Sequence, residues 1–208
     1  MKHPKILYFY DPLCGWCYAF SPELKKLMEK HPNWEVEVIT GGMVRGASEG
    51  PIGNMSEYIL GALPRVEEMS SVTFGEEFKN VLRAGTQHSS SIPPSRALAV
   101  VKRFFPEEQY AFSILMQREL YQNGSDLNDN KLYFKLFEEL ELSTDVLTEY
   151  LEDELSLKWA NEDFQFAANC GISGYPALVI QKEEEYFLAA KGFTRFEQLE
   201  EVVDRIVG

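Results

Sequence analysis

Two cysteines near the start of the chain, Cys14 and Cys17, are the residues best suited to covalent chemistry. They lie three positions apart in the stretch YFYDPLCGWCYAF, residues 8–20. On a helical turn this spacing brings two sulfur atoms onto one face, within reach of a disulfide after small rotations. Such a pair can exchange electrons with another disulfide, supply half of a metal site, or simply be packed as two inert thiols.

The metal interpretation requires more ligands than the chain offers at suitable spacing. A structural zinc site takes four ligands, usually from two such pairs. There is no second CxxC, and the other candidates, Cys170, His3, His31 and His88, are scattered along the sequence. Packed core cysteines are also disfavoured, because the pair follows an apolar run and a proline-containing turn. We therefore predict a redox pair, with no metal and no cofactor.

Composition limits the partners and the compartment. The 208 residues carry a formal net charge of −13, which repels phosphate backbones and anionic lipid, so we expect no nucleic-acid and no membrane partner. No apolar run approaches the roughly 20 residues of a membrane span, and the first residues lack the pattern of a secretory signal. These features predict a cytoplasmic protein. Structural disulfides are rare in that compartment, so a close cysteine pair points to redox chemistry or metal binding.

Hydrophobic patterns on both sides of the pair predict the elements that position it. KILYFY, residues 5–10, is typical of a buried strand, and WEVEVIT, residues 34–40, of a second one. Between them we expect a helix that begins near Cys14. Ser21 and Pro22 resemble a second helix start, so we expect a kink around Pro22.

The remainder of the chain predicts a helical block followed by a hairpin. From about residue 54 to 169, apolar residues recur at helical spacing in about five short segments. PALVIQ and YFLAAKG then flank a polar turn at residues 182–185, and TRFEQLEEVVDRIVG is typical of an amphipathic closing helix. Without the block, a β-α-β…β-β-α unit remains. We predict an α/β fold: a thioredoxin-like core with a mixed sheet (1–53 and 170–208) and an inserted helical domain (54–169).

Within this arrangement the two cysteines receive different roles. Cys14 would lie at a helix N-terminus, where unpaired N–H groups and the helix dipole favour an anion. The thiolate is the nucleophilic form, so Cys14 would attack a substrate disulfide and the more shielded Cys17 would resolve the mixed disulfide. We expect Trp16 to be exposed for substrate contact. The neutral Gly15-Trp16 dipeptide favours a reductase or an isomerase over a strong oxidant.

A second signal lies at CGISGYPALVI, residues 170–180. A proline that opens an apolar strand removes a donor from the strand ladder. A cis Tyr175–Pro176 bond would explain this proline, because the turn would place the backbone of Tyr175 beside the cysteines, free to pair with a substrate chain. We assign Asp11 a structural role in the turn before Cys14, and Cys170 the role of a small core residue.

These motifs resemble a known family. DPLCGWCY, followed at a distance by GISGYPALVI with a helical insertion between, is similar to the DsbA-like branch of the thioredoxin superfamily. The similarity is closest to its cytosolic members, the relatives of FrnE and of 2-hydroxychromene-2-carboxylate isomerase, and it covers essentially the whole chain. It implies a thioredoxin core with a helical domain over the active site, Cys14 and Cys17 as the redox centre, and Pro176 as a cis proline.

One departure from the pattern decides between activities. The isomerase and the kappa-class glutathione transferases have a serine at the position of Cys14 and lack the second cysteine. The pair therefore favours thiol–disulfide exchange on protein or small-molecule disulfides, glutathione among them, with Trp16, Gly15, Tyr175 and Pro176 contacting the substrate. Two alternatives stay open: an adaptor that presents partner proteins to a protease, and a glutathione-dependent isomerase or transferase that uses Cys14.

Overall fold

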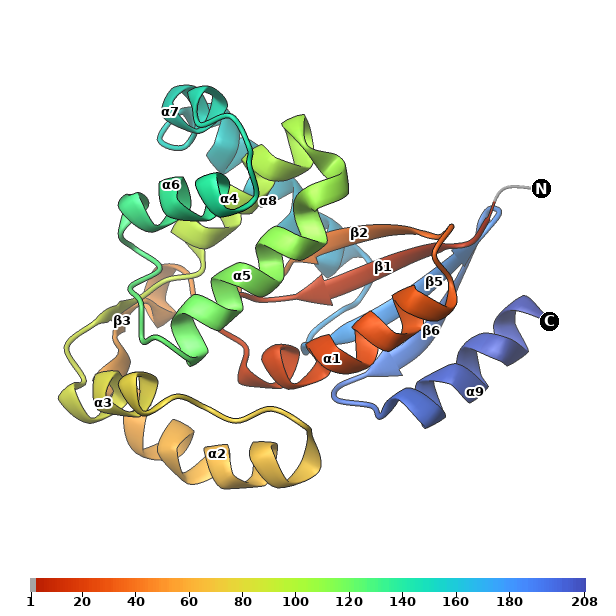
Figure 1. Ribbon diagram of the computed structural model, residues 1–208, viewed down its shortest axis with the longest axis horizontal. Helices are drawn as coiled ribbons and strands as arrows, with labels where there is room; N and C mark the ends of the chain where they lie inside the picture. The colour runs from red at the N-terminus through yellow and green to blue at the C-terminus, as the bar shows by residue number, and fades with distance from the viewer. Residues whose placement is uncertain (1–2) are drawn as a thin grey trace.

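A mixed four-stranded sheet forms the centre of the protein. The structure, a computed structural model, describes residues 3–208 (Figure 1). The strand order is β2-β1-β5-β6; β1 is parallel to β2 and antiparallel to β5, and β5 is antiparallel to β6. The strands are β1 (Lys5–Tyr10), β2 (Glu35–Thr40), β5 (Ala177–Lys182) and β6 (Glu185–Lys191). The predicted α/β class and mixed sheet are confirmed.

Helices make up most of the remaining described chain. They are α1 (Gly15–Lys30), α2 (Ser56–Met69), α3 (Glu76–Ala84), α4 (Ile92–Phe104), α5 (Gln109–Tyr121), α6 (Asn130–Glu139), α7 (Asp145–Tyr150), α8 (Glu154–Asn169) and α9 (Phe196–Val207). Short 3₁₀ turns and a two-stranded pair, β3 (Gly50–Pro51) with β4 (His88–Ser89), complete the secondary structure of the described residues. None of the helices in residues 3–208 is long and apolar enough to cross a membrane.

Strand β1 shows how the sheet separates two layers. Its side chains alternate between the two faces: Tyr8 and Tyr10 belong to the large core beneath α1, whereas Leu7 and Phe9 belong to a second cluster on the face of α8. All four are buried, and burying a large apolar side chain contributes roughly 1.5–3 kcal/mol. Because β1 is buried on both faces, its sequence KILYFY is a nearly continuous apolar run and does not alternate with polar residues.

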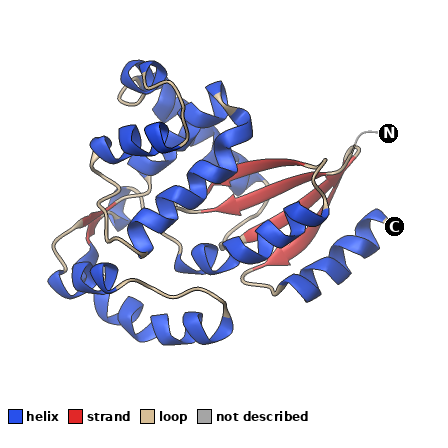
Figure 2. Cartoon of the chain, viewed as in Figure 1, coloured by secondary structure: helices blue, strands red, loops and turns tan. Residues whose placement is uncertain are grey.

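Most of the inserted helices lie at one end of the sheet, and α8 also packs against the face opposite α1. Figure 2 shows that the helices between β2 and β5 gather at the end at which β1 stops, while α1 and α9 run side by side along one face of the sheet. The segment after Tyr10 therefore leaves the sheet directly into the junction between the core and the insertion. The proposed limits of the two parts, 1–53 with 170–208 and 54–169, stay a prediction.

One expectation about the helices is wrong. The insertion holds seven α-helices, not about five; α2 was missed, because Gly61 and Pro64 weaken its helical pattern. Helix α1 begins at Gly15, beside Cys14 as predicted, and continues through Pro22; the kink around Pro22 stays a prediction. Proline has no N–H for the carbonyl of Tyr18, four residues earlier, and the Ser21 hydroxyl donates to that oxygen instead, at 2.8 Å.

Candidate active site

Cys14 caps the N-terminus of α1. Its backbone is extended (φ −91°, ψ 106°), and its Sγ accepts a hydrogen bond from the Cys17 N–H at 3.2 Å. Serine, threonine and aspartate commonly cap helices in this way, and here a sulfur occupies the same position. The first N–H groups of α1 and the positive end of its dipole therefore face Cys14 Sγ.

Cys17 lies behind Cys14 in the protein interior. It is 0% exposed, whereas Cys14 retains 6% exposure, and both are free thiols. Burial raises the pKa of Cys17 well above its usual range, and the neighbouring Cys14 adds to the rise. The Tyr8 hydroxyl holds the backbone at this position by donating to the Cys17 carbonyl at 3.2 Å. Cys14 is therefore the more accessible of the two cysteines.

The Tyr175–Pro176 segment meets the cysteines from the far end of the chain. The peptide bond is cis, as expected from the sequence. The thiol of Cys14 donates to the Tyr175 carbonyl oxygen at 3.6 Å, across 161 positions of sequence. Pro176 lies directly before β5, and its carbonyl accepts from the Gly192 N–H at 2.7 Å. Four of the predicted site residues, Cys14, Cys17, Tyr175 and Pro176, are thus brought together.

The Tyr175 ring packs against Gly41, a residue that the sequence analysis did not identify. The hydroxyl of Tyr175 donates to the Gly41 carbonyl at 3.3 Å, and a Cβ at Gly41 would overlap the ring. Gly41 follows β2, so this contact connects the end of that strand to the residue whose carbonyl faces Cys14. The paired glycines Gly41 and Gly42, directly after WEVEVIT, were the signal in the sequence that could have indicated this close approach.

Replacing Gly41 by alanine is expected to displace the Tyr175 side chain. Overpacking of this kind costs about 1–3 kcal/mol, and the loss is expected to disappear in a Tyr175→Ala background, where the ring is gone. Urea unfolding of the two single variants and the double variant measures this coupling. Gly61→Ala is the matched control, because nothing lies near a Cβ at Gly61. An equal loss of unfolding free energy from Gly41→Ala in the wild-type and Tyr175→Ala backgrounds would contradict the contact.

Trp16 was predicted to be exposed, and this prediction is wrong. It is half-buried, and its ring packs against Phe193 with the centroids 5.9 Å apart. An indole at the second position of α1 covers apolar surface beside the β6–α9 loop, which stabilises the start of the helix. Gly15 is also half-buried and lies against Phe74, between α2 and α3. Both residues border the cysteines, and their contact with substrate stays a prediction.

Asp11 has the structural role predicted for it. Its buried carboxylate accepts from the Leu13 N–H at 2.9 Å, the Met43 N–H at 2.7 Å and the Ser91 hydroxyl at 2.9 Å. Ser91 N-caps α4 in the insertion, and Met43 lies in the loop after β2. Asp11 therefore joins three segments at the entrance to α1. Burial raises the pKa of Asp11, and its hydrogen-bond donors oppose that rise.

The sequence model of the DSBA-like thioredoxin domain matches residues 5–204, almost the entire chain. The chain belongs to this family. It is thus a DsbA-like member of a family of thiol–disulfide oxidoreductases, in agreement with the cysteine geometry above. No curated protein sequence matches it.

Solved structures share the fold of this DsbA-like chain over its whole length. A candidate protein disulfide isomerase from Nitrosomonas europaea has a TM-score of 0.86 at 24% identity and covers 98% of this chain and 97% of its own. The cytosolic disulfide reductase DsbM from Pseudomonas aeruginosa has a TM-score of 0.83 at 21% identity and covers 98% of each chain. A 2-hydroxychromene-2-carboxylate isomerase has a TM-score of 0.69 at 13% identity, covering 97% and 95%. These likenesses confirm the thioredoxin fold with a helical insertion.

The third cysteine of this DsbA-like protein lies apart from the pair. Cys170, expected in the core, is exposed at the end of α8. It borders a cavity of about 370 Å³ with Leu7 and Phe9, on the sheet face opposite α1. The prediction failed because the position after the last helical turn points outward. No group of three His, Cys, Asp or Glu side chains suited to a metal ion occurs within residues 3–208.

Proposed function

We propose that the protein is a thiol–disulfide oxidoreductase in which Cys14 is the nucleophile and Cys17 the resolving cysteine. One observation carries this proposal: Cys14 Sγ accepts the Cys17 N–H at the start of α1 and lies 3.6 Å from the carbonyl of the cis-proline segment, while Cys17 is sealed behind it. The two thiols are chemically alike, so their different access to solvent assigns their order of reaction.

The exchange proceeds in two displacements. The Cys14 thiolate attacks one sulfur of a substrate disulfide; that bond breaks, and the departing thiolate takes up a proton. Cys17 then loses its proton and attacks Cys14 Sγ, which breaks the mixed disulfide and releases the second substrate thiol. The substrate has gained two electrons and two protons, and the enzyme disulfide is returned to the dithiol by a thiol such as glutathione.

The cis-proline segment supplies the docking contact for the substrate. The Tyr175 carbonyl beside Cys14 can accept an N–H from an extended chain that carries the disulfide, since its present partner is only a weak thiol donor. A chain-like substrate, either a protein or a small peptide such as glutathione, fits this mode. The structure of DsbM in complex with glutathione, which matches this chain with a TM-score of 0.80, supports glutathione as one partner. DsbM is described as a cytosolic reductase, and this similarity supports a cytoplasmic location.

Reduction of insulin disulfides, driven by dithiothreitol, tests the proposal. The wild type is expected to accelerate insulin precipitation over dithiothreitol alone, and the Cys14→Ala/Cys17→Ala variant is expected to match the rate without protein. A wild type without activity would overturn the redox function. If the double variant also retained a binding partner, the adaptor function would be favoured. Isomerase turnover with glutathione by Cys17→Ala would favour the second alternative, the glutathione-dependent isomerase or transferase.

A further inference from the structure

A cavity of about 370 Å³ hollows the sheet face opposite α1, and neither cysteine of the redox pair lines it. Leu7 and Phe9 line it from β1, which α8 helps to bury on this face. Tyr186 and Leu188 line it from the edge strand β6 and are 58% and 53% exposed (Figure 1). Large apolar side chains left open to water around one concave site are typical of a ligand-binding surface.

A bulge in β6 brings a cation to this cavity. The pairing of β6 with β5 shifts register between Leu188 and Ala190, so Ala189 is an extra residue in the strand. In a regular strand side chains alternate between the two faces, and Lys191 would lie on the face opposite Leu188. The extra residue moves the alternation by one position. Lys191 therefore lines the cavity together with Leu188.

The cavity is apolar except for this one unpaired positive charge. Its larger apolar lining residues are Leu7, Phe9, Ile172, Ala177, Val179 and Leu188. No acidic residue lines it, although the chain has 33 Asp and Glu residues. Lys191 takes part in none of the ion pairs found within residues 3–208. Partial burial raises the pKa of the Cys170 thiol at the border, so this thiol adds no negative charge.

We propose that this cavity binds a small amphipathic anion, with its apolar body against Leu7, Phe9 and Leu188 and its carboxylate at Lys191. An apolar body removes the lining side chains from water, and a carboxylate supplies the partner that Lys191 lacks. The cavity volume lies within the range of small-molecule sites, about 300–1,000 Å³. The site is separate from the redox pair, so the inference goes beyond the proposed function.

A small molecule fits this cavity better than a second copy of the chain. A stable interface between two proteins buries roughly 800 Å² on each partner, which is far more surface than one cavity offers. A second copy would also bring a net charge of −13 towards an equally acidic molecule. A single carboxylate on an apolar body matches both the shape and the charge.

Calorimetric titration with octanoate, and with octan-1-ol as its neutral analogue, tests the proposal. The wild type is expected to bind octanoate saturably, one molecule per chain. Lys191→Met keeps an apolar side chain of similar length, and it is expected to weaken octanoate binding about fivefold while octan-1-ol binding stays within about twofold. Lys131→Met is the matched control, because it removes the same charge from the exposed surface of α6. It is expected to leave both affinities within about twofold of the wild type.

Alkylation of the reduced protein by iodoacetamide, followed by peptide mass measurement, locates the bound octanoate. Saturating octanoate is expected to slow the alkylation of Cys170 and to leave that of Cys14 unchanged, because only Cys170 borders the cavity. Leu188→Glu places a carboxylate on the exposed wall and is expected to abolish both octanoate binding and this protection.

Four results would overturn the inference. They are no saturable binding by the wild type, equal weakening in Lys191→Met and Lys131→Met, protection of Cys14 in place of Cys170, and a loss of octan-1-ol affinity in Lys191→Met equal to that of octanoate. Analytical ultracentrifugation covers the other occupant. A wild-type dimer that does not bind octanoate and that Leu188→Glu dissociates would assign this face to a second copy of the chain.

Discussion

Cys17→Ser is expected to hold its substrate in a covalent mixed disulfide through Cys14, whereas Cys14→Ser is expected to form no adduct. The serine hydroxyl cannot displace a thiolate from a disulfide, so the first displacement occurs and the second does not. The backbone N–H that caps Cys14 Sγ survives the change at position 17. Multiple turnover is expected to fall by on the order of a thousandfold in both variants, but only one of them traps substrate.

The difference in burial explains why the two variants should not be equivalent. Cys17 is fully buried, and burial raises its pKa, so in Cys14→Ser the remaining thiol is both inaccessible and a poor nucleophile. In Cys17→Ser the remaining thiol is the one beside the Tyr175 carbonyl, where a substrate chain can dock. The same reasoning predicts slow alkylation of Cys17 in the native protein.

Intact-mass measurement after exposure to glutathione disulfide tests this prediction. Cys170 is exposed and would form adducts of its own, so both variants are made in a Cys170→Ser background. One glutathione per chain in Cys17→Ser, released by dithiothreitol, is the expected result. An adduct of equal occupancy in Cys14→Ser would reverse the assigned roles of the two cysteines.

The elements that bury apolar residues in a regular pattern were predictable. KILYFY and EVEVIT form β1 and β2, and PALVIQ begins with the cis proline that the sequence led us to expect. These segments follow local rules: a strand buried on both faces is apolar throughout, and a proline before a strand must be accommodated in a turn. The redox pair was predictable for the same reason, since its spacing and its place after a strand are local features.

Contacts between distant segments were not predictable. Asp11 and Ser91 are 80 positions apart, and Tyr175 and Gly41 are 134 apart, so no spacing rule connects either pair. The Phe196 N–H at the start of α9 donates to the Glu23 carboxylate on α1 at 3.0 Å. Glu23 thus caps α9 from a distant segment, which the sequence around α9 does not predict. Tertiary packing also decided the orientation of Trp16, which depends on Phe193 and not on its neighbours in the CxxC turn.

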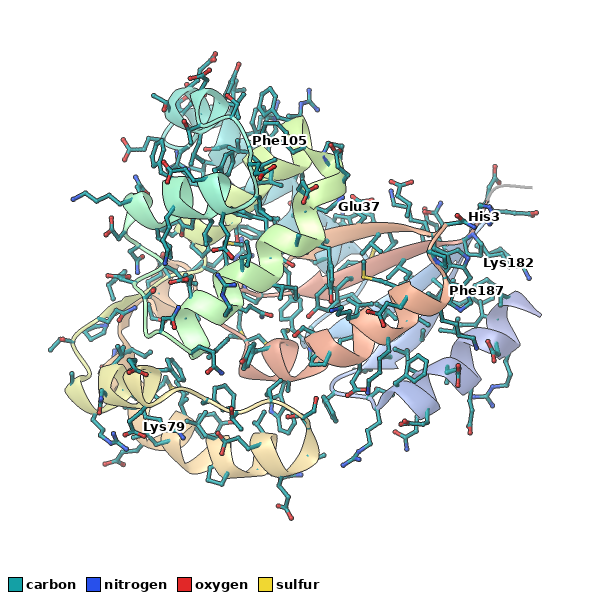
Figure 3. The ribbon with its side chains drawn as sticks, viewed as in Figure 1. His3, Glu37, Lys79, Phe105, Lys182 and Phe187 are labelled. Carbon is teal, nitrogen blue, oxygen red and sulfur yellow. The ribbon has the colours of Figure 1, made fainter. Side chains whose placement is uncertain are left out.

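A second large effect is expected at a buried ion pair that fastens the insertion to the sheet. Lys102 Nζ on α4 lies 2.6 Å from Asp163 Oδ1 on α8, and Asp163 Oδ2 accepts the Thr40 N–H at the end of β2, at 3.2 Å. Both charged side chains are largely buried. Glu37 on β2, labelled in Figure 3, adds a second negative charge 3.9 Å from Lys102 Nζ.

Lys102→Met is expected to destabilise the protein by about 3 kcal/mol, because it leaves the Asp163 carboxylate buried without its cation. For a chain of this length, the loss corresponds to a fall in Tm of about 6–12 °C by calorimetry. Lys30→Met is the matched control: Lys30 pairs with Glu200 at 2.8 Å on the exposed surface between α1 and α9, so its loss is expected to be much smaller. Equal losses would contradict the buried character of the Lys102 pair.

The pH dependence of this loss identifies its cause. Burial raises the pKa of Asp163 above its unfolded value, and Lys102 opposes the rise by its charge and its hydrogen bond. Without Lys102 the folded pKa moves higher still. A carboxyl group whose folded pKa is raised destabilises the protein when it is ionised and ceases to do so as the pH falls through that pKa. The gap in Tm between wild type and Lys102→Met is therefore expected to narrow between pH 7 and pH 5.

Adding Asp163→Asn to Lys102→Met is expected to recover much of the stability at pH 7, because the neutral amide removes the buried charge and can still accept the Thr40 N–H. A gap independent of pH, with no recovery in the double variant, would mean that Lys102 stabilises the protein through packing alone.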